Sequence, residues 1–460
     1  MTAQCPSPRL WSCSVNGCSA ASAIDVGACE CCCSHYCWQH VDSPDHTCEK
    51  EPLDEDAWYG ARAAELHAVY ERMQDTALLE IAQGLRPNVP CEMAPKDTTS
   101  SAMLGGMHMH MEVCFADGIS WLARIPRMNF QSFPSDITNA LLLSECGTLR
   151  WLEGANIPAP RLHAYGLQGD AANKVGIPYM LIDKLPGRPF LGLDASPAQK
   201  ERVYTALARI LATLKQHPLD KIGCFTLSPD EQVQLGPVLG DRAGTHYHDG
   251  PFDDAKTYYA SWCEHHLALI ADRQLYAQYA VDAYVMFAFL KEQALAGAWN
   301  CVAPEHDSGP FYLKHLDDKG DHIFVDEDFN ITGIIDWSFA RVVPLYEAFG
   351  PSLLTADLNG LFGGVPGDRV EDELLATKLD GIVPSLGAVA RSADIVRRLT
   401  FGPGLGMGFT KDEAVASFKA MLATLGLETS NFDWESWRME YLRSHQHDIR
   451  LQLLEDRESG

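Results

Sequence analysis

Cysteine and histidine residues crowd the first fifty positions of the sequence. Nine of its 15 cysteines lie between Cys5 and Cys48. Eight nitrogen and sulfur donors follow the pattern C-x4-C-x10-C-x2-C-x4-C-x2-H-x5-H-x-C, and these residues are Cys13, Cys18, Cys29, Cys32, Cys37, His40, His46 and Cys48. Because structural zinc takes four such donors in a closed tetrahedron, the eight donors predict two zinc ions.

A segment of this length buries too little apolar surface to fold alone, so we expect bound metal to supply the missing free energy. Four side chains are candidates for a small core, namely Trp11, Ile24, Tyr36 and Trp38. The alternative is a disulfide knot or a patch of reactive thiols, although regularly spaced histidines have no role in a disulfide framework. Cys31 and Cys33 flank Cys32 and compete with it for one ligand position.

Two aspartates, Asp317 and Asp336, form the second group of residues suited to chemistry. An apolar strand over 311–313 leads to Asp317, and a hairpin of 323–325 with 331–335 leads to Asp336. One carboxylate at such a strand end can accept or orient an attacking hydroxyl, while the other holds magnesium on nucleotide phosphates. The alternative is an unrelated hairpin with two surface aspartates.

The elements that must position these residues follow from hydrophobic periodicity and turn signals. Residues 49–56 are acidic and resemble a linker, and residues 84–102 resemble a loop. We expect strands over 107–115, 120–125 and 179–185, and helices over 57–83, 135–153, from Ser196-Pro197 to about Leu214, within 253–297, and over 411–424 and 433–455. This order predicts a small β-rich lobe followed by a large helical lobe.

The spacing of the N-terminal donors resembles that of the AN-one-type zinc finger over residues 11–49. In that family the ligand pairs interleave as a cross-brace. The resemblance therefore implies one zinc ion on Cys13, Cys18, Cys37 and His40. It implies a second zinc ion on Cys29, Cys32, His46 and Cys48. If the protein is a non-enzymatic module, this segment would dock a protein partner.

The later motifs resemble the aminoglycoside phosphotransferase family, whose members often read HGDLHxxN and then IDWE. His315 and Asp317 match the first motif, and Ile335-Asp336-Trp337 matches the second. The resemblance covers about residues 100–400. It implies a protein-kinase-like fold, ATP and magnesium as cofactors, and a small-molecule substrate. His315 and Asp317 would then be catalytic, and Asp336 would bind the metal.

The same resemblance assigns supporting positions. Arg124 lies where the family has its phosphate-pairing cation, Glu145 lies at the position of the partner carboxylate, and His322 lies at the position of a magnesium-binding Asn. The chain departs from the family in four ways. Imidazole is a poor magnesium ligand, Arg replaces Lys, and only Gly105-Gly106 stands for a glycine-rich loop. The catalytic loop also has Leu316 and Asp318-Lys319 where the family has smaller or different residues. These departures favour an alternative, a catalytically impaired, pseudokinase-like binding module.

Composition limits the remaining possibilities. The net charge of -26 opposes binding to a nucleic-acid backbone. We see no signal peptide and no apolar run of membrane-spanning length, so we expect a cytoplasmic or nuclear protein. The predicted fold class is α+β, with a two-zinc finger at 11–49, a linker and helix at 50–102, a kinase-like N-lobe at 103–186 and a helical C-lobe at 187–460 that carries the catalytic-type hairpin at 311–340.

Overall fold

The computed structural model describes residues 9–29, 32–42, 45, 46, 48, 55–96, 104–129, 132–240, 245–365, 367–402, 409–427 and 429–459. The predictions for Cys31 and for the linker positions 49–54 lie outside these residues. Among the helices of the described ranges, none is both long and apolar enough to span a bilayer.

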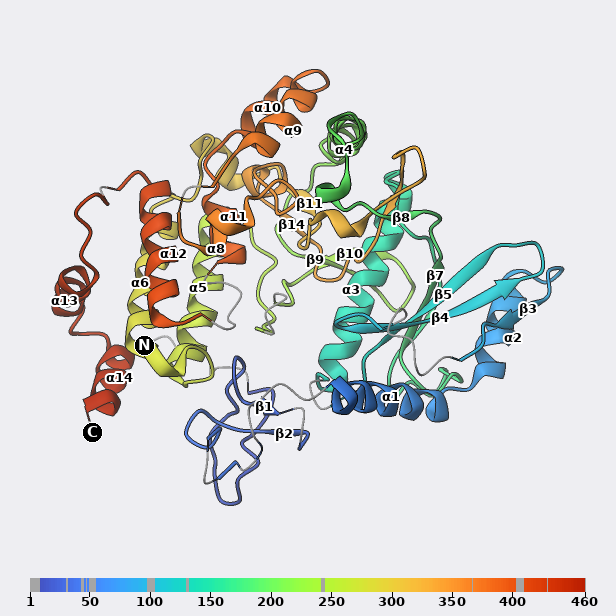
Figure 1. Ribbon diagram of the computed structural model, residues 1–460, viewed down its shortest axis with the longest axis horizontal. Coiled ribbons are helices and arrows are strands. Elements are labelled where there is room, and N and C mark those ends of the chain that lie inside the picture. Colours follow the sequence, from blue (N-terminus) through green and yellow to red (C-terminus); the bar gives the residue numbers. More distant parts are fainter. Residues whose placement is uncertain are drawn as a thin grey trace.

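The first lobe is built on an antiparallel five-stranded sheet with the strand order β3-β4-β5-β7-β6. The strands are β3 (Cys91–Met93), β4 (His108–Phe115), β5 (Ser120–Pro126), β6 (Leu162–Gly166) and β7 (Tyr179–Asp183). The predicted hairpin of β4 and β5 is confirmed by the pairing of His108 with Pro126 through to Cys114 with Ser120. In Figure 1 this sheet occupies the right side of the molecule.

Alternation along the strands decides which side chains face the helical lobe. Ala123 and Ile125 of β5 are fully buried in the core that α1 and α2 cover. Because successive strand residues point to opposite faces, Arg124 lies on the other face of the sheet. That face packs against α3 (Ser135–Gly154), whose apolar residues join the core of the helical lobe.

Two helices cover the outer face of the sheet where the sequence predicts one. These are α1 (Glu55–Arg72) and α2 (Asp75–Leu85). The break falls at Gln74, whose backbone is extended and whose N–H donates to the carbonyl of Val175 at 2.9 Å. Because the Gln74 N–H donates to another segment, it cannot donate to a carbonyl of the preceding helical turn, so α1 ends before Gln74.

The first lobe also begins earlier than predicted. Residues 84–102 were expected to be a loop, but Cys91–Met93 form the edge strand β3 and pair with β4 from Val113 to Phe115. A strand of three residues is too short to give an alternating pattern that can be recognised in the sequence.

The second lobe is mainly helical and lies on the left of Figure 1. Its elements are η2 (Gly192–Asp194), α4 (Pro197–Leu214), β9 (Cys224–Leu227), β10 (Val233–Gly236), α5 (Ala255–Ala271), η3 (Ala277–Tyr279), α6 (Ala280–Leu295), η4 (Pro304–Ser308), α7 (Leu345–Ala348), α8 (Leu358–Phe362), α9 (Val370–Asp380), α10 (Pro384–Ala390), α11 (Ile395–Phe401), α12 (Lys411–Thr424), α13 (Trp434–Ser444) and α14 (Ile449–Ser459). The predicted helix at 433–455 is two helices, because Asp448 accepts from the N–H groups of Arg450 and Leu451 and starts a new one.

Short strands between the lobes carry the two aspartates. β11 (Tyr312–Lys314) pairs with β14 (Arg341–Val343), and it leads into Asp317. β12 (Ile323–Val325) pairs with β13 (Ile331–Ile334) and with β8 (Arg188–Pro189). The hairpin predicted before Asp336 is therefore present, with η5 (Gly320–His322) leading into it.

The N-terminal segment packs against the body of the protein at the bottom of Figure 1, where β1 (Ala28–Cys29) pairs with β2 (Ser34–His35). Its Ile24 N–H donates to the carbonyl of Gln274 at 2.7 Å. The N–H of Tyr276 donates to the Asp25 carboxylate at 2.8 Å. The segment is therefore docked on the turn after α5.

Two of the predicted core residues of this segment contact the body. Trp11 stacks on His35 within the segment and also on Phe133 of the first lobe, with ring centroids 4.7 and 5.9 Å apart. The guanidinium of Arg273 lies 4.6 Å from the Trp38 ring. These aromatic rings join the segment to the body as well as stabilising it.

Candidate functional site

A buried ion pair joins the sheet to α3. Arg124 and Glu145 are both almost fully buried, and Arg124 Nε lies 3.3 Å from Glu145 Oε1. Arg124 lies on the inner face of β5, and Glu145 lies on the side of α3 that faces it. The two residues that the sequence paired by resemblance are therefore in contact, and both are buried.

Asp336 completes this cluster from the second lobe. Arg124 Nη2 donates to Asp336 Oδ1 at 2.5 Å and to Ser338 Oγ at 2.9 Å. Ser338 in turn donates to Glu145 Oε2 at 2.8 Å. Asp336 has a φ of 59°, an unusual conformation for a residue other than glycine that is frequent at functional sites.

The charges of the cluster are arranged so that Asp336 is the stronger acid of its two carboxylates. Burial alone would raise the pKa of Asp336, but Arg124 and the neighbouring histidines outweigh it and hold that pKa well below its usual range. Burial raises the pKa of Glu145, and Arg124 offsets this only in part. Asp336 is therefore ionised at neutral pH, as a cation ligand must be.

His322 lies between the two predicted aspartates. Its Nδ1 lies 2.9 Å from the carbonyl oxygen of Asp317 and 3.6 Å from the Asp317 carboxylate. Its Nε2 lies 3.5 Å from Asp336 Oδ2. The structure therefore brings together Asp317, His322 and Asp336, the three residues that the sequence assigned to proton transfer and metal binding.

His315, predicted to be catalytic, is buried beneath this group. Its Nε2 donates to the carbonyl of Ile335 at 2.8 Å, and its ring packs edge-on against Trp337. Burial, together with the charge of His322, lowers the pKa of His315 to about 4. A neutral imidazole bonded to the residue before Asp336 positions that aspartate, and it is poorly suited to donate a proton at neutral pH.

Asp318, the neighbour of Asp317, fixes the loop from the other side. Its carboxylate accepts from the N–H of Leu353 at 2.8 Å and from Lys314 Nζ at 2.7 Å. The segment after Leu353 is held by Thr355, which donates to the buried carboxylate of Asp372 at 2.5 Å. These contacts connect the loop of Asp317 to α9.

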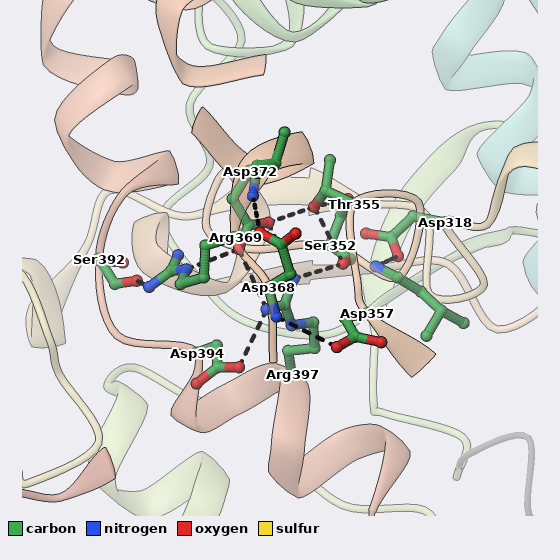
Figure 2. Close-up of polar contacts among 12 residues, drawn as sticks. Asp318, Ser352, Thr355, Asp357, Asp368, Arg369, Asp372, Ser392, Asp394 and Arg397 are labelled. Carbon is green, nitrogen blue, oxygen red and sulfur yellow. Dashed lines mark hydrogen bonds and ion pairs between the residues drawn. The ribbon is translucent and has the colours of Figure 1, made fainter. Parts of the chain in front are cut away.

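Figure 2 shows the rest of this buried network. Arg397 of α11 donates to Asp372 at 2.9 Å and to Asp394 at 3.0 Å, and Arg369 donates to Asp372 at 2.8 Å. Asp372 and Arg397 are buried, and buried charges are stable only when they are paired and hydrogen-bonded, as these two are. The network gives the loop of Asp317 a rigid support that is distant from it in sequence.

A cavity of about 360 Å³ adjoins the Arg124 cluster. Glu145 and Ser338 form part of its wall, and the hairpin tip Gly106-Met107 that precedes β4 forms another part. Trp11 and Ile24 of the N-terminal segment close it. The Gly105-Gly106 pair therefore lies beside the site, at the position expected of a glycine-rich loop. The hairpin tip is short, and it is closed by the hydrogen bond from the Gly105 N–H to the His108 carbonyl.

The first predicted metal site is assembled. One donor atom from each of Cys13, Cys18, Cys37 and His40 lies within 4.8 Å of every other. The sulfur atoms of Cys18 and Cys37 are 3.9 Å apart. Two thiolates on one tetrahedral zinc ion, with zinc–sulfur bonds of about 2.3 Å, are about 3.8 Å apart, so this geometry suits zinc.

The second predicted site is assembled in the same way from Cys29, Cys32, His46 and Cys48. His46 Nδ1 donates to the carbonyl of Val41 at 2.8 Å, which leaves Nε2, 3.8 Å from the Cys32 sulfur, as the nitrogen that could bind a metal ion. Such a bond from the distal ring nitrogen is typical of zinc-bound histidine.

The competition between neighbouring cysteines is decided in part. Cys33 lies outside both groups of donors, whereas Cys32 belongs to the second group. The cysteines that the structure describes are free, so the alternative of a disulfide knot finds no support among them.

Two members of the cluster were missed by the sequence prediction. Ser338 bridges Arg124 and Glu145, and its position two residues after Asp336 is the only signal that could have indicated it. His110 lies 3.3 Å from Arg124 Nη1, and its place on the inner face of β4 could have indicated it, because its cross-strand partner is Arg124.

The sequence matches the phosphotransferase enzyme family (APH) over residues 120–356, which is just over half of the chain. The chain therefore belongs to this family. The matched region contains Arg124, Glu145, Asp317, His322 and Asp336, and it ends before α9. No curated protein matches the chain.

Several solved structures are similar to this one. Macrolide 2'-phosphotransferase type I is 15% identical, with a TM-score of 0.38 and coverage of 75% of this chain and 96% of its own. The streptomycin–ATP complex of APH(2")-IIa is 11% identical, with a TM-score of 0.42 and coverage of 77% and 99%. Plasmodium vivax ethanolamine kinase is 11% identical, with a TM-score of 0.39 and coverage of 86% and 91%.

Proposed function

We propose that the protein transfers the γ-phosphoryl group of ATP to a hydroxyl group of a small molecule. The observation that carries this proposal is the juxtaposition of Asp317 and Asp336 on either side of His322, with Asp336 held by the buried Arg124–Glu145 pair. Membership of the phosphotransferase enzyme family supports the reaction class.

The residues of the site fit a divalent cation. Asp336 Oδ2 and His322 Nε2 are 3.5 Å apart, and Asp336 Oδ1 is used by Arg124. A carboxylate oxygen and an imidazole nitrogen that face each other in this way are a donor pair for one ion. A divalent ion bound there would neutralise negative charge on the nucleotide phosphates.

In the proposed reaction Asp317 accepts the proton of the acceptor hydroxyl. The acceptor oxygen forms a bond to the γ-phosphorus, the bond from that phosphorus to the bridging oxygen breaks, and ADP leaves with the electron pair. Arg124 supplies positive charge for the phosphates, and Glu145 and Ser338 keep its guanidinium in place. Most of the rate enhancement in such reactions comes from positioning and electrostatics, which rigid groups provide.

We also propose that the N-terminal segment holds two structural zinc ions in the AN-one-type arrangement. The two groups of four donors and the second-shell bond of His46 support this assignment. Ile24, Asp25 and Trp11 contact the body of the protein, so the segment forms part of the wall of the cavity beside the Arg124 cluster. Its opposite side is the surface on which a protein partner would dock.

One observation favours the alternative of a non-catalytic binding module. Arg124 forms a 2.5 Å ion pair with Asp336, the residue that has to bind the metal. An arginine that remained there would compete with the cation for the Asp336 carboxylate. Under the alternative, the protein would hold a ligand without metal-dependent nucleotide binding.

Nucleotide binding in the presence and absence of a divalent ion tests the proposal. We expect wild-type protein to bind ATP only when magnesium or manganese is present, and Asp336→Asn to weaken that binding at least about tenfold. Binding that is the same without metal, and the same in Asp336→Asn, would support the non-catalytic alternative. The variant Asp328→Asn, in the exposed turn between β12 and β13, serves as the control.

A further inference from the structure

We propose that the divalent-cation site of this protein takes Mn²⁺ in preference to Mg²⁺, with His322 Nε2 as a direct ligand beside Asp336 Oδ2. This inference rests on the proposed function. It concerns a residue that distinguishes this chain, because an imidazole stands where an amide oxygen was expected.

The tautomer of His322 is fixed by its surroundings. Nδ1 lies 2.9 Å from the carbonyl oxygen of Asp317, and a carbonyl oxygen can only accept. Nδ1 therefore carries a proton, as the hydrogen-bond network assigns it. A neutral imidazole protonated at Nδ1 has its lone pair on Nε2, the nitrogen that faces Asp336.

The gap between the two facing atoms can hold either a proton or a metal ion. Asp336 Oδ1 already accepts from Arg124, so the oxygen that faces His322 is Oδ2. A lone pair on Nε2 and a carboxylate oxygen repel each other at 3.5 Å unless a proton or a metal ion lies between them, and a metal ion that binds there displaces the proton. The same second-shell arrangement, with a backbone carbonyl on the distal nitrogen, is present at His46 of the N-terminal segment.

The separation of the two atoms is close to what one ion requires. Two neighbouring ligands at about 2.1 Å from an octahedral ion are about 3 Å apart. The observed 3.5 Å needs a movement of only about half an ångström, and His322 is on the short η5 segment, where the chain is not part of a sheet.

The chemistry of the donors decides the preferred ion. Magnesium demands hard oxygen ligands, whereas imidazole suits first-row transition ions. Phosphate oxygens from the nucleotide would fill the rest of an octahedral shell, and of the ions that accept both nitrogen and hard oxygen in that geometry, Mn²⁺ is the one closest to Mg²⁺. Zinc favours the tetrahedral thiolate sites of the N-terminal segment.

Pulsed electron paramagnetic resonance tests this directly on the zinc-loaded full chain with Mn²⁺ and a non-hydrolysable ATP analogue. We expect ¹⁴N modulation from a directly bound imidazole in the wild type, and its replacement by a ¹⁵N signal when histidine is ¹⁵N-labelled. The labelling arm needs no variant, so it does not depend on whether a substituted protein folds.

The variant His322→Asn supplies the second arm, because Asn offers an amide oxygen at the same position. We expect it to lose the ¹⁴N modulation and to lower the ratio of the Mg²⁺ to the Mn²⁺ dissociation constant about tenfold. His163→Asn, a histidine paired with Asp183 on the sheet, is the matched control and should keep both properties.

The outcomes separate this inference from the proposed function. Bound Mn²⁺–nucleotide without nitrogen coupling, or a metal preference unchanged in His322→Asn, would overturn the manganese inference and leave the phosphotransferase proposal standing. If neither Mn²⁺ nor Mg²⁺ supports nucleotide binding by the wild type, both proposals are overturned.

Discussion

Arg124 Nη2 lies 2.5 Å from Asp336 Oδ1, although the two residues are 212 positions apart in the sequence. This contact joins the sheet of the first lobe to the hairpin of the second, across the boundary at which nucleotide is expected. Because Glu145 and Ser338 bind the same guanidinium, any change in the relative position of the lobes alters the surroundings of Asp336.

We predict that Glu145→Gln destabilises the fold by about 1–3 kcal/mol. The substitution keeps the shape of the side chain but leaves Arg124 with less compensation for its buried charge, and Asp336 still pairs with it. Urea unfolding measures the change. On the same helix, Glu153 forms a partly exposed pair with Arg161, so Glu153→Gln should cost under about 0.5 kcal/mol. Equal losses in the two variants would contradict the role given to Glu145.

We predict that Asp317→Asn lowers kcat by about 10²–10⁴-fold and leaves nucleotide affinity nearly unchanged, because it removes the proton acceptor and no phosphate contact. The formation of ADP in the presence of a mixture of small alcohols, followed by ³¹P NMR, measures this. A variant with full activity would show that another group accepts the proton.

Metal analysis of single variants should resolve the two zinc sites. We predict two zinc ions per wild-type chain, one after Cys37→Ser and one after Cys32→Ser, because each substitution removes a ligand from a different group. Cys33→Ser is the control and should retain two, since Cys33 lies outside both groups. If purified wild-type protein contained no zinc, the assignment would be contradicted.

The pH dependence of stability should carry the signature of Asp25. Burial raises the pKa of Asp25 to about 6, whereas an unfolded aspartate has a pKa of about 3.9. A raised folded pKa means that the protonated form is favoured in the native state. Asp25 therefore makes its contribution to the free energy of unfolding below about pH 4. This contribution is lost as the pH rises through 6, and the free energy of unfolding falls by at most about 3 kcal/mol.

The variant Asp25→Asn tests this signature, because an amide oxygen can still accept from the N–H of Tyr276. We predict that the difference in unfolding free energy between variant and wild type favours the variant and grows from pH 5 to pH 7. Asp230→Asn, in an exposed turn, should show no such trend. A difference that is constant over this range would contradict the burial of an ionisable Asp25.

The sequence predicted those parts of the site whose residues are close together along the chain. The zinc donors are found from spacing alone, because a tetrahedral ion constrains short loops, and both groups are assembled as predicted. Asp317 and Asp336 are the ends of one strand and one hairpin, which turn and strand patterns indicate.

Contacts between distant segments could not be predicted in this way. The stacking of Trp11 on Phe133 and the bond of Asp25 to Tyr276 depend on how the N-terminal segment docks, and no local pattern encodes that. The strand β3 and the hairpin of β9 and β10 were missed because each is short and gains its stability from pairing. The helix break at Gln74 was missed because its cause is a bond to Val175 in another part of the lobe.

Isothermal titration of ATP, with Mn²⁺ or Mg²⁺, into wild-type, Asp317→Asn and Asp336→Asn protein tests the central claim most directly. The account predicts one nucleotide per chain for wild type and for Asp317→Asn, with binding at least about tenfold weaker in Asp336→Asn. Identical binding in all three proteins, or no binding in any of them, would contradict it.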